Sequence, residues 1–134
     1  MKEPVWLLKE LILALHDQLL ADFGGSAGVR DKGLLESALA RPANLFAYGH
    51  PSLFDLAAAY AIGIISNQPF IDGNKRSGFM AAYIFLCRNG YYLTASEPTA
   101  TAATLSLAIK EMTESEYAHW LSENCQEINS KTQA

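Results

Sequence analysis

Residues 56–65 read LAAAYAIGII and decide the fold. They are apolar on every face of a helix, which is typical of a helix buried on all sides. The run is about half as long as the roughly 20 residues that a membrane-spanning helix needs. Directly before it, Ser52 and Asp55 have the spacing of a capping box, which marks a helix start. The sequence therefore predicts a buried helix at the centre of a packed domain.

Apolar residues recur at helical spacing on both sides of this centre, and no segment alternates cleanly at period two. The patterns and capping residues predict further helices over about 4–23, 31–41, 74–90, 96–110 and 113–122. Pro42 is expected to end the second of these, because it disfavours the helical conformation of its predecessor. That would leave a loop over 43–51. We expect an extended segment at Tyr91-Tyr92-Leu93.

The expected fold class is all-α, a compact single-domain bundle of about six helices. Residues 1–125 form the domain, and the polar residues 126–134 are expected to be a frayed C-terminal tail. No linker, internal repeat or low-complexity segment interrupts the chain.

The composition bounds the function. Of 134 residues, half are apolar and 18% are charged, against a usual charged share of about 25%, which excludes a disordered chain. The net charge is -4 and the ten Lys and Arg residues are scattered, apart from Lys75-Arg76, so direct binding of nucleic acid is not expected. Lys9 and Glu10 interrupt the first apolar stretch, unlike a signal peptide. We expect a cytoplasmic protein with no membrane association.

The cysteines and histidines form no recognisable site. Cys87 and Cys125 lie in apolar helical patterns, and we expect both to be reduced packing residues. His16, His50 and His119 are far apart in the sequence and have neither zinc-site spacing nor a nucleophile to form a triad with. Each is expected to be a surface or structural histidine, and a metal hydrolase is not expected.

The chemistry is concentrated in residues 68–76, which read QPFIDGNKR. A turn passes through Asp72 and Gly73 into a helix that opens with two cations. Backbone N–H groups at a helix N-terminus are unpaired, and a glycine lets the backbone approach a phosphate closely. Cations are mildly unfavourable in a first turn, so Lys75 and Arg76 indicate a bound anion. Asp72 beside them is suited to hold a Mg²⁺ ion that bridges nucleotide phosphates.

These residues also allow a structural interpretation, in which Asp72 and Asn74 cap the helix and the two cations lie in solvent. The stretch is no Walker motif, and no dinucleotide-binding fingerprint is present.

The same stretch resembles the signature of the Fic/Doc superfamily, and within it the death-on-curing (Doc) toxins of bacterial toxin-antitoxin modules. That signature is His-x-Phe-x-Asp/Glu-Gly/Ala-Asn, followed by Gly or Lys and then Arg. The chain matches it at Phe70, Asp72, Gly73, Asn74, Lys75 and Arg76. The resemblance covers about residues 8–122 and includes Leu15-His16-Asp17, Gly24-Gly25, Gly28-Val29-Arg30-Asp31, Leu34 to Ala38, Arg41-Pro42 and Phe85 to Tyr91.

The resemblance implies an all-α fold whose motif loop and following helix bind ATP with Mg²⁺. It implies that the nucleotide is bound by Phe70, Gly73, Asn74, Lys75 and Arg76. It also implies that Asp72 binds the metal and that Asp72, Lys75 and the residue at position 68 are catalytic. A flap presenting the acceptor hydroxyl would correspond to residues 43–51.

Lys75 bears on the reaction. Fic-type enzymes have Gly there and transfer AMP, whereas Doc-type toxins have Lys and transfer the γ-phosphoryl group. A charged side chain in place of glycine changes how the triphosphate is positioned. The resemblance therefore implies a protein kinase whose target is a threonine of elongation factor Tu, so that translation stops. AMP transfer remains the alternative.

Position 68 departs from the family, which has its catalytic His where this chain has Gln68. The His acts as general base, and a glutamine amide has no usable basic site near neutral pH. The chain is therefore expected to be inactive or weakly active, either as a natural relative or through a change that allows a toxic protein to be produced.

Two other possibilities remain. The chain could be a non-catalytic relative that still binds nucleotide or antitoxin, or a plain helical scaffold without a ligand. The resemblance implies an antitoxin whose disordered C-terminal segment folds into an apolar groove of this domain.

Overall fold

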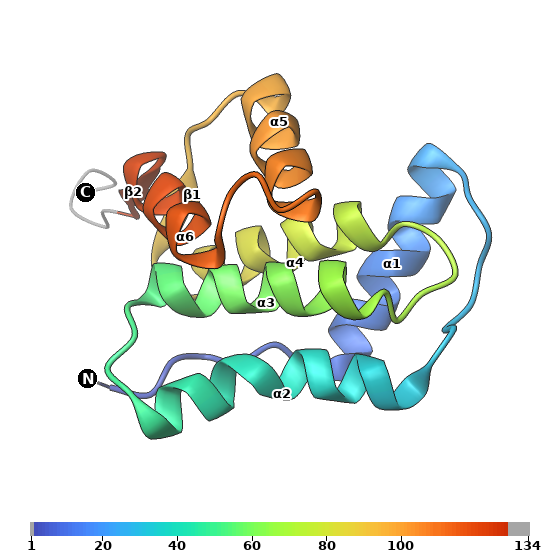
Figure 1. The fold of residues 1–134 in the computed structure, drawn as a ribbon, viewed down its shortest axis with the longest axis horizontal. Helices are drawn as coiled ribbons and strands as arrows, with labels where there is room; N and C mark the ends of the chain where they lie inside the picture. Colours follow the sequence, from blue (N-terminus) through green and yellow to red (C-terminus); the bar gives the residue numbers. More distant parts are fainter. Residues whose placement is uncertain (1, 129–134) are drawn as a thin grey trace.

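α3 (Leu53–Asn67) runs through the middle of the protein and is the element against which the others pack, as the computed structural model in Figure 1 shows. The structure describes residues 2–128. Around α3 lie α2 on one side and α4 and α6 on the other, and α1 crosses near the N-terminal end of α4 (Figure 1). The other elements are α1 (Lys9–Phe23), α2 (Lys32–Tyr48), α4 (Asn74–Arg88), β1 (Tyr91–Leu93), α5 (Glu97–Ala108), α6 (Glu114–Glu123) and β2 (Cys125–Glu127).

The central helix begins where the capping box predicts. The Ser52 hydroxyl accepts a hydrogen bond from the Asp55 N–H at 3.1 Å, and the Ser52 N–H donates to the Asp55 carboxylate at 2.8 Å. Within residues 56–65 every side chain except that of Ile62 is buried. The all-α class is confirmed, with six helices and one two-stranded sheet within residues 2–128.

α3 and α4 approach each other closely because α4 has a glycine at the contact. A Cβ atom on Gly78 would lie 2.8 Å from Ile65 Cγ1 and 3.0 Å from the carbonyl oxygen of Ala61. Neither distance is tolerable for a real methyl group without movement of α3. The glycine therefore sets how deeply α4 can sit, and with it the burial of Ala81 and Phe85.

The prediction that Pro42 ends the second helix is wrong. α2 continues to Tyr48, so residues 43–48 are helical and the expected loop over 43–51 is reduced to the connection 49–52. A proline inside a helix costs about 3 kcal/mol. Here the continued helix buries the proline ring completely and brings Phe46 edge-on to Trp6, with ring centroids 5.6 Å apart. Tertiary packing outweighs the lost hydrogen bond.

The first helix begins at Lys9 rather than at Pro4. Residues before it form hydrogen bonds with distant parts of the chain that helical geometry would not permit. The Leu7 N–H donates to the Tyr60 hydroxyl at 3.1 Å, and Val5 exchanges two backbone bonds with the Asn89 side chain, at 2.8 and 3.1 Å. These tertiary bonds keep the segment extended.

The two helices of the C-terminal half begin at the predicted capping residues. Ser96 caps α5, and Thr113 with Glu116 forms both bonds of a capping box on α6. The extended segment at Tyr91-Tyr92-Leu93 is confirmed as β1, which pairs antiparallel with β2. The chain therefore does not leave the fold at Gln126 as predicted. Residues 129–134 of the expected frayed tail lie outside the described residues.

Both cysteines are free thiols, as predicted, and both are half-buried. Cys87 lies in α4, whereas Cys125 lies in β2 and not in the helical pattern expected for it. Burial, followed by the proximity of Cys87, raises the pKa of Cys125 to about 11, so this thiol stays protonated near neutral pH. Burial likewise raises the pKa of Tyr117 to about 12, and the hydrogen bond between the Thr104 and Tyr117 hydroxyls partly offsets this effect. Within residues 2–128 no helix is long and apolar enough to span a bilayer.

Replacing Gly78 with alanine should destabilise the fold. The added methyl group overlaps α3, and we expect the free energy of unfolding to fall by about 1–3 kcal/mol despite the higher helix propensity of alanine. Urea denaturation measures this. In the matched variant Gly33→Ala, the new methyl group has only an ordinary 3.4 Å contact, and stability should be unchanged or raised. Equal stability of Gly78→Ala and the parent would contradict the close packing.

Candidate functional site

The loop 68–73 joins the C-terminal end of α3 to the start of α4, at the edge of the molecule where the connection after α1 also passes (Figure 1). Gln68 opens this loop in the left-handed conformation, with φ of 48°, and its N–H still bonds to the Ile64 carbonyl of α3 at 3.0 Å. This conformation turns the chain sharply out of the helix. The Gln68 side chain is exposed at the rim of the loop.

One side of the loop pairs with residues 28–31 in a short antiparallel bridge. Val29 pairs with Phe70, the Ile71 N–H donates to the Gly28 carbonyl at 3.1 Å, and the Arg30 N–H donates to the Pro69 carbonyl at 2.6 Å. The loop is therefore held along its length by a segment about 40 residues earlier in the chain.

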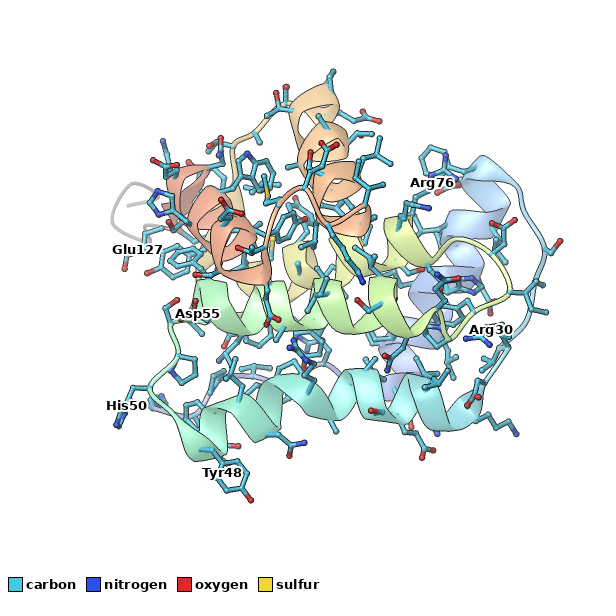
Figure 2. The ribbon with its side chains drawn as sticks, viewed as in Figure 1. Arg30, Tyr48, His50, Asp55, Arg76 and Glu127 are labelled. Carbon is cyan, nitrogen blue, oxygen red and sulfur yellow. The ribbon has the colours of Figure 1, made fainter. Side chains whose placement is uncertain are left out.

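The Arg30 side chain, labelled in Figure 2, stabilises the turn at Gln68. Its Nε donates to the Gln68 carbonyl at 2.8 Å, and its Nη2 donates to the Asn67 carbonyl at 2.9 Å. These carbonyls belong to the end of α3, where helices leave acceptors unpaired. A left-handed conformation is uncommon for a residue other than glycine. Arg30 therefore stabilises the turn that orients position 68.

Two of the predicted nucleotide-binding residues act inside the loop. The Phe70 ring is fully buried, so it anchors the loop in the core and does not face the exterior. The Asn74 side chain bonds twice to the Phe70 backbone: Oδ1 accepts from its N–H and Nδ2 donates to its carbonyl, both at 3.0 Å. Phe70 and Asn74 thus form a rigid frame that holds the backbone of residues 71–73 between them.

Asp72 lies on the exposed side of this frame. Its carboxylate accepts from the Gly73 N–H at 2.9 Å and from the Ser26 N–H at 3.3 Å. Gly25 has φ of 121°, a conformation that favours glycine, and a Cβ atom there would lie 2.9 Å from the Asp72 Oδ2, so the connection after α1 passes close to this carboxylate. Backbone donors thus orient the carboxylate, while its exposure leaves it accessible to a cation.

Lys75 and Arg76 are exposed in the first turn of α4. The Arg76 guanidinium lies over the exposed Phe23 ring of α1, 4.3 Å from the ring centroid. None of the ion pairs among residues 2–128 involves either cation. No side chain caps α4, so its first backbone N–H groups are open to an incoming acceptor.

A buried histidine beneath the loop was not singled out by sequence reasoning as part of the site. His16 of α1 is 3% exposed, its Nε2 lies 2.7 Å from the Asp72 carbonyl, and its ring stacks on Phe70 with centroids 3.8 Å apart. The expectation that it is a structural histidine is confirmed. Its distance from the motif in the sequence gave no indication of the contact.

The donor set at the loop suits a magnesium ion that arrives with a phosphate. Within residues 2–128 no group of three or more His, Cys, Asp or Glu side chains could hold a metal alone. Mg²⁺ at nucleotide sites is usually bound by one or two carboxylates together with phosphate oxygens. Asp72 supplies one such carboxylate beside the open N-terminus of α4.

A cavity of about 380 Å³ lies elsewhere. It is lined by the C-terminal end of α2, the start of α3 and the start of α6. His50 and Asp55 are among its lining residues, and Figure 2 shows them at the opposite end of α3 from Arg30. The cavity therefore does not belong to the loop site.

Comparison with known proteins agrees with this arrangement. A family model described as "Fic/DOC family" matches residues 6–86, which span α1 to α4 and the whole loop. The chain is 46% identical over 76 residues to "Toxin Doc" of Mycolicibacterium smegmatis (strain ATCC 700084 / mc(2)155), covering 54% of this chain and 58% of that protein. It is 33% identical over 113 residues to "Protein kinase doc" of Escherichia phage P1, covering 84% of this chain and 89% of that protein. The chain belongs to the Fic/Doc family.

Replacing Arg30 with alanine should loosen the loop. Two carbonyls lose their charged donor, and we expect the backbone amides of residues 70–72 to exchange with solvent about tenfold faster, while stability falls by about 1 kcal/mol. Hydrogen exchange followed by mass spectrometry measures the first effect. Arg88→Ala, which removes an exposed arginine at the other end of α4, should leave the loop unchanged. Unaltered exchange in Arg30→Ala would show that the guanidinium does not hold the turn.

Proposed function

We propose that this protein is a Doc-like toxin built to transfer the γ-phosphoryl group of ATP to a threonine hydroxyl of elongation factor Tu, which stops translation. The observation that carries the proposal is the convergence, at one exposed edge, of the open N-terminus of α4, two cations without an ion-pair partner among residues 2–128, and an oriented carboxylate. Such an edge complements a polyphosphate.

In this proposal the triphosphate lies on the backbone N–H groups that begin α4, and Lys75 and Arg76 neutralise its oxygens. Mg²⁺ at Asp72 would reduce the charge on the phosphates. Gly73 leaves room for a close approach of backbone to phosphate. Phe70 and Asn74 contribute indirectly, because their buried contacts set the shape of the loop.

Transfer of the γ-phosphoryl group is favoured over transfer of AMP. The chain has Lys75 where Fic-type enzymes that transfer AMP have glycine, and its phage P1 relative is described as a protein kinase. In the reaction the acceptor oxygen bonds to the γ-phosphorus as the bond from that phosphorus to the bridging oxygen breaks, which leaves ADP. Positioning and charge neutralisation supply most of the catalysis in such reactions.

Gln68 makes the chain as written a weak catalyst. The family's histidine would take the proton of the acceptor hydroxyl, whereas the exposed Gln68 amide can only orient that hydroxyl through a hydrogen bond. A non-catalytic protein that retains nucleotide and antitoxin binding is therefore the second candidate function, and Gln68 is the observation that favours it.

The proposed partner is an antitoxin, since one relative is named as a toxin. A disordered C-terminal segment of the antitoxin would fold as a helix into an apolar groove of this domain. Both ATP and elongation factor Tu are cytoplasmic in bacteria, so the proposed site of action is the cytoplasm.

ATP binding is the first test. Isothermal titration with ATP and Mg²⁺ should show that Lys75→Ala and Arg76→Ala each bind about tenfold more weakly than the parent, because each loses a charge-assisted contact with phosphate. Asp72→Asn should make the affinity less dependent on Mg²⁺. Arg88→Ala on the same helix is the matched control and should bind like the parent. Unchanged affinity in both Lys75→Ala and Arg76→Ala would refute the anion site.

The reaction itself is tested with Gln68→His, which restores a general base. Given elongation factor Tu and ATP labelled at the γ or the α phosphorus, this variant should transfer γ label at least about 100-fold faster than the parent. Adding Lys75→Ala should abolish the gain. Transfer of α label would identify AMP transfer instead, and equal rates for parent and variant would show that position 68 is not the base. Growth arrest on expression of Gln68→His would support the role as a toxin.

A further inference from the structure

His16 makes three contacts with the motif loop from below. Besides its stacking on Phe70 and its contact with the Asp72 carbonyl, it borders Gly73, whose added Cβ would lie 3.5 Å from the His16 Nε2. The side chain is nearly enclosed, at 3% exposed. One buried ring on α1 thus touches three of the four residues that lead into α4.

The contact with Asp72 has a defined direction. A backbone carbonyl oxygen only accepts hydrogen bonds, so the His16 Nε2, 2.7 Å away, must carry the hydrogen and donate. The parallel stacking on Phe70, with an interplanar angle of 8°, fixes the plane of the imidazole and therefore the direction of this donor.

This hydrogen bond also determines where the next amide points. A trans peptide unit is planar, and its C=O and N–H point in opposite directions. Because His16 draws the Asp72 carbonyl into the interior, the Gly73 N–H is turned outward, where the Asp72 carboxylate accepts from it at 2.9 Å. The outward N–H lies immediately before the open N-terminus of α4.

Without this bond the peptide would have an alternative orientation. Rotation of the peptide plane between Asp72 and Gly73 changes mainly the ψ of Asp72 and the φ of Gly73. Gly73 has φ of 80°, and glycine populates both signs of φ with similar ease. A flipped peptide would present a carbonyl oxygen to an approaching anion in place of an N–H. Local backbone preference does not exclude that state, so a tertiary contact must.

We infer that His16 is a positioning residue for the anion site: its Nε2–H selects the peptide orientation in which the Gly73 N–H faces outward and holds the Asp72 carboxylate beside the open N-terminus of α4. It does not touch the reacting atoms. The inference rests on the proposed function for the identity of the ligand. It predicts that the hydrogen-bond donor, and not merely an aromatic ring at this position, is required for tight binding of nucleotide.

Two variants separate the donor from the ring. His16→Phe keeps an aromatic ring to stack on Phe70 and removes the donor, whereas His16→Gln places an amide N–H at a similar reach and removes the ring. His119→Phe is the matched control, because His119 is an exposed histidine on α6 paired with Glu123. His16→Met replaces the Phe variant if that one does not fold.

The first readout needs no nucleotide. In ¹H–¹⁵N spectra of the free protein, the Gly73 amide signal of His16→Phe should be displaced from its parent position, because the peptide orientation is no longer selected, and His16→Gln should restore the parent position. The second readout is isothermal titration with ATP and Mg²⁺ well below the unfolding temperature. Here His16→Phe should bind about tenfold more weakly, and His16→Gln and His119→Phe within about twofold of the parent.

A Gly73 amide that is unchanged in His16→Phe overturns the inference. So does equal ATP affinity in folded His16→Phe and the parent, because a purely structural histidine would lower stability without changing the affinity of the folded protein. Failure of the parent to bind ATP would refute the proposed function instead, and the Gly73 amide would then decide the positioning role alone.

Discussion

The close approach of α3 and α4 at Gly78 is the constraint on which the rest of the structure depends. A side chain at that position would meet the Ala61 carbonyl and Ile65, so only glycine allows the two helices to pack at this depth. Their packing brings the C-terminus of α3 and the N-terminus of α4 within reach of six loop residues. A loop this short must turn sharply, which explains the left-handed conformation of Gln68.

Short loops of this kind are held by contacts from elsewhere. The bridge with residues 28–31, the guanidinium of Arg30 and the ring of His16 fix three different backbone groups of the loop. Together they form a rigid support for the charged side chains of the site. Asp72, Lys75 and Arg76 lie exposed on this support. A site on a rigid frame loses little conformational entropy when it binds, which suits recognition of a polyphosphate.

Elements with local determinants lie where the sequence predicts them, whereas elements that depend on distant contacts differ from the prediction. The capping boxes at Ser52 and Thr113 correctly located two helix starts, because each depends on residues three apart. The stop expected at Pro42 was wrong, since burial of the proline ring and the contact of Phe46 with Trp6 outweigh the local penalty. The helix expected from Pro4 begins only at Lys9, because hydrogen bonds with Tyr60 and Asn89 keep the residues before it extended.

The sequence by itself determined the helical class, the buried central helix and the motif loop, because apolar periodicity, caps and the order of Asp72, Gly73 and the two cations are written along the chain. Only the tertiary structure decided which residues hold that loop. His16 and Arg30 lie 56 and 38 residues away from the carbonyls they bind. No local pattern encodes such pairs, because their contact exists only once helix packing has brought α1 and the connection after it against the loop.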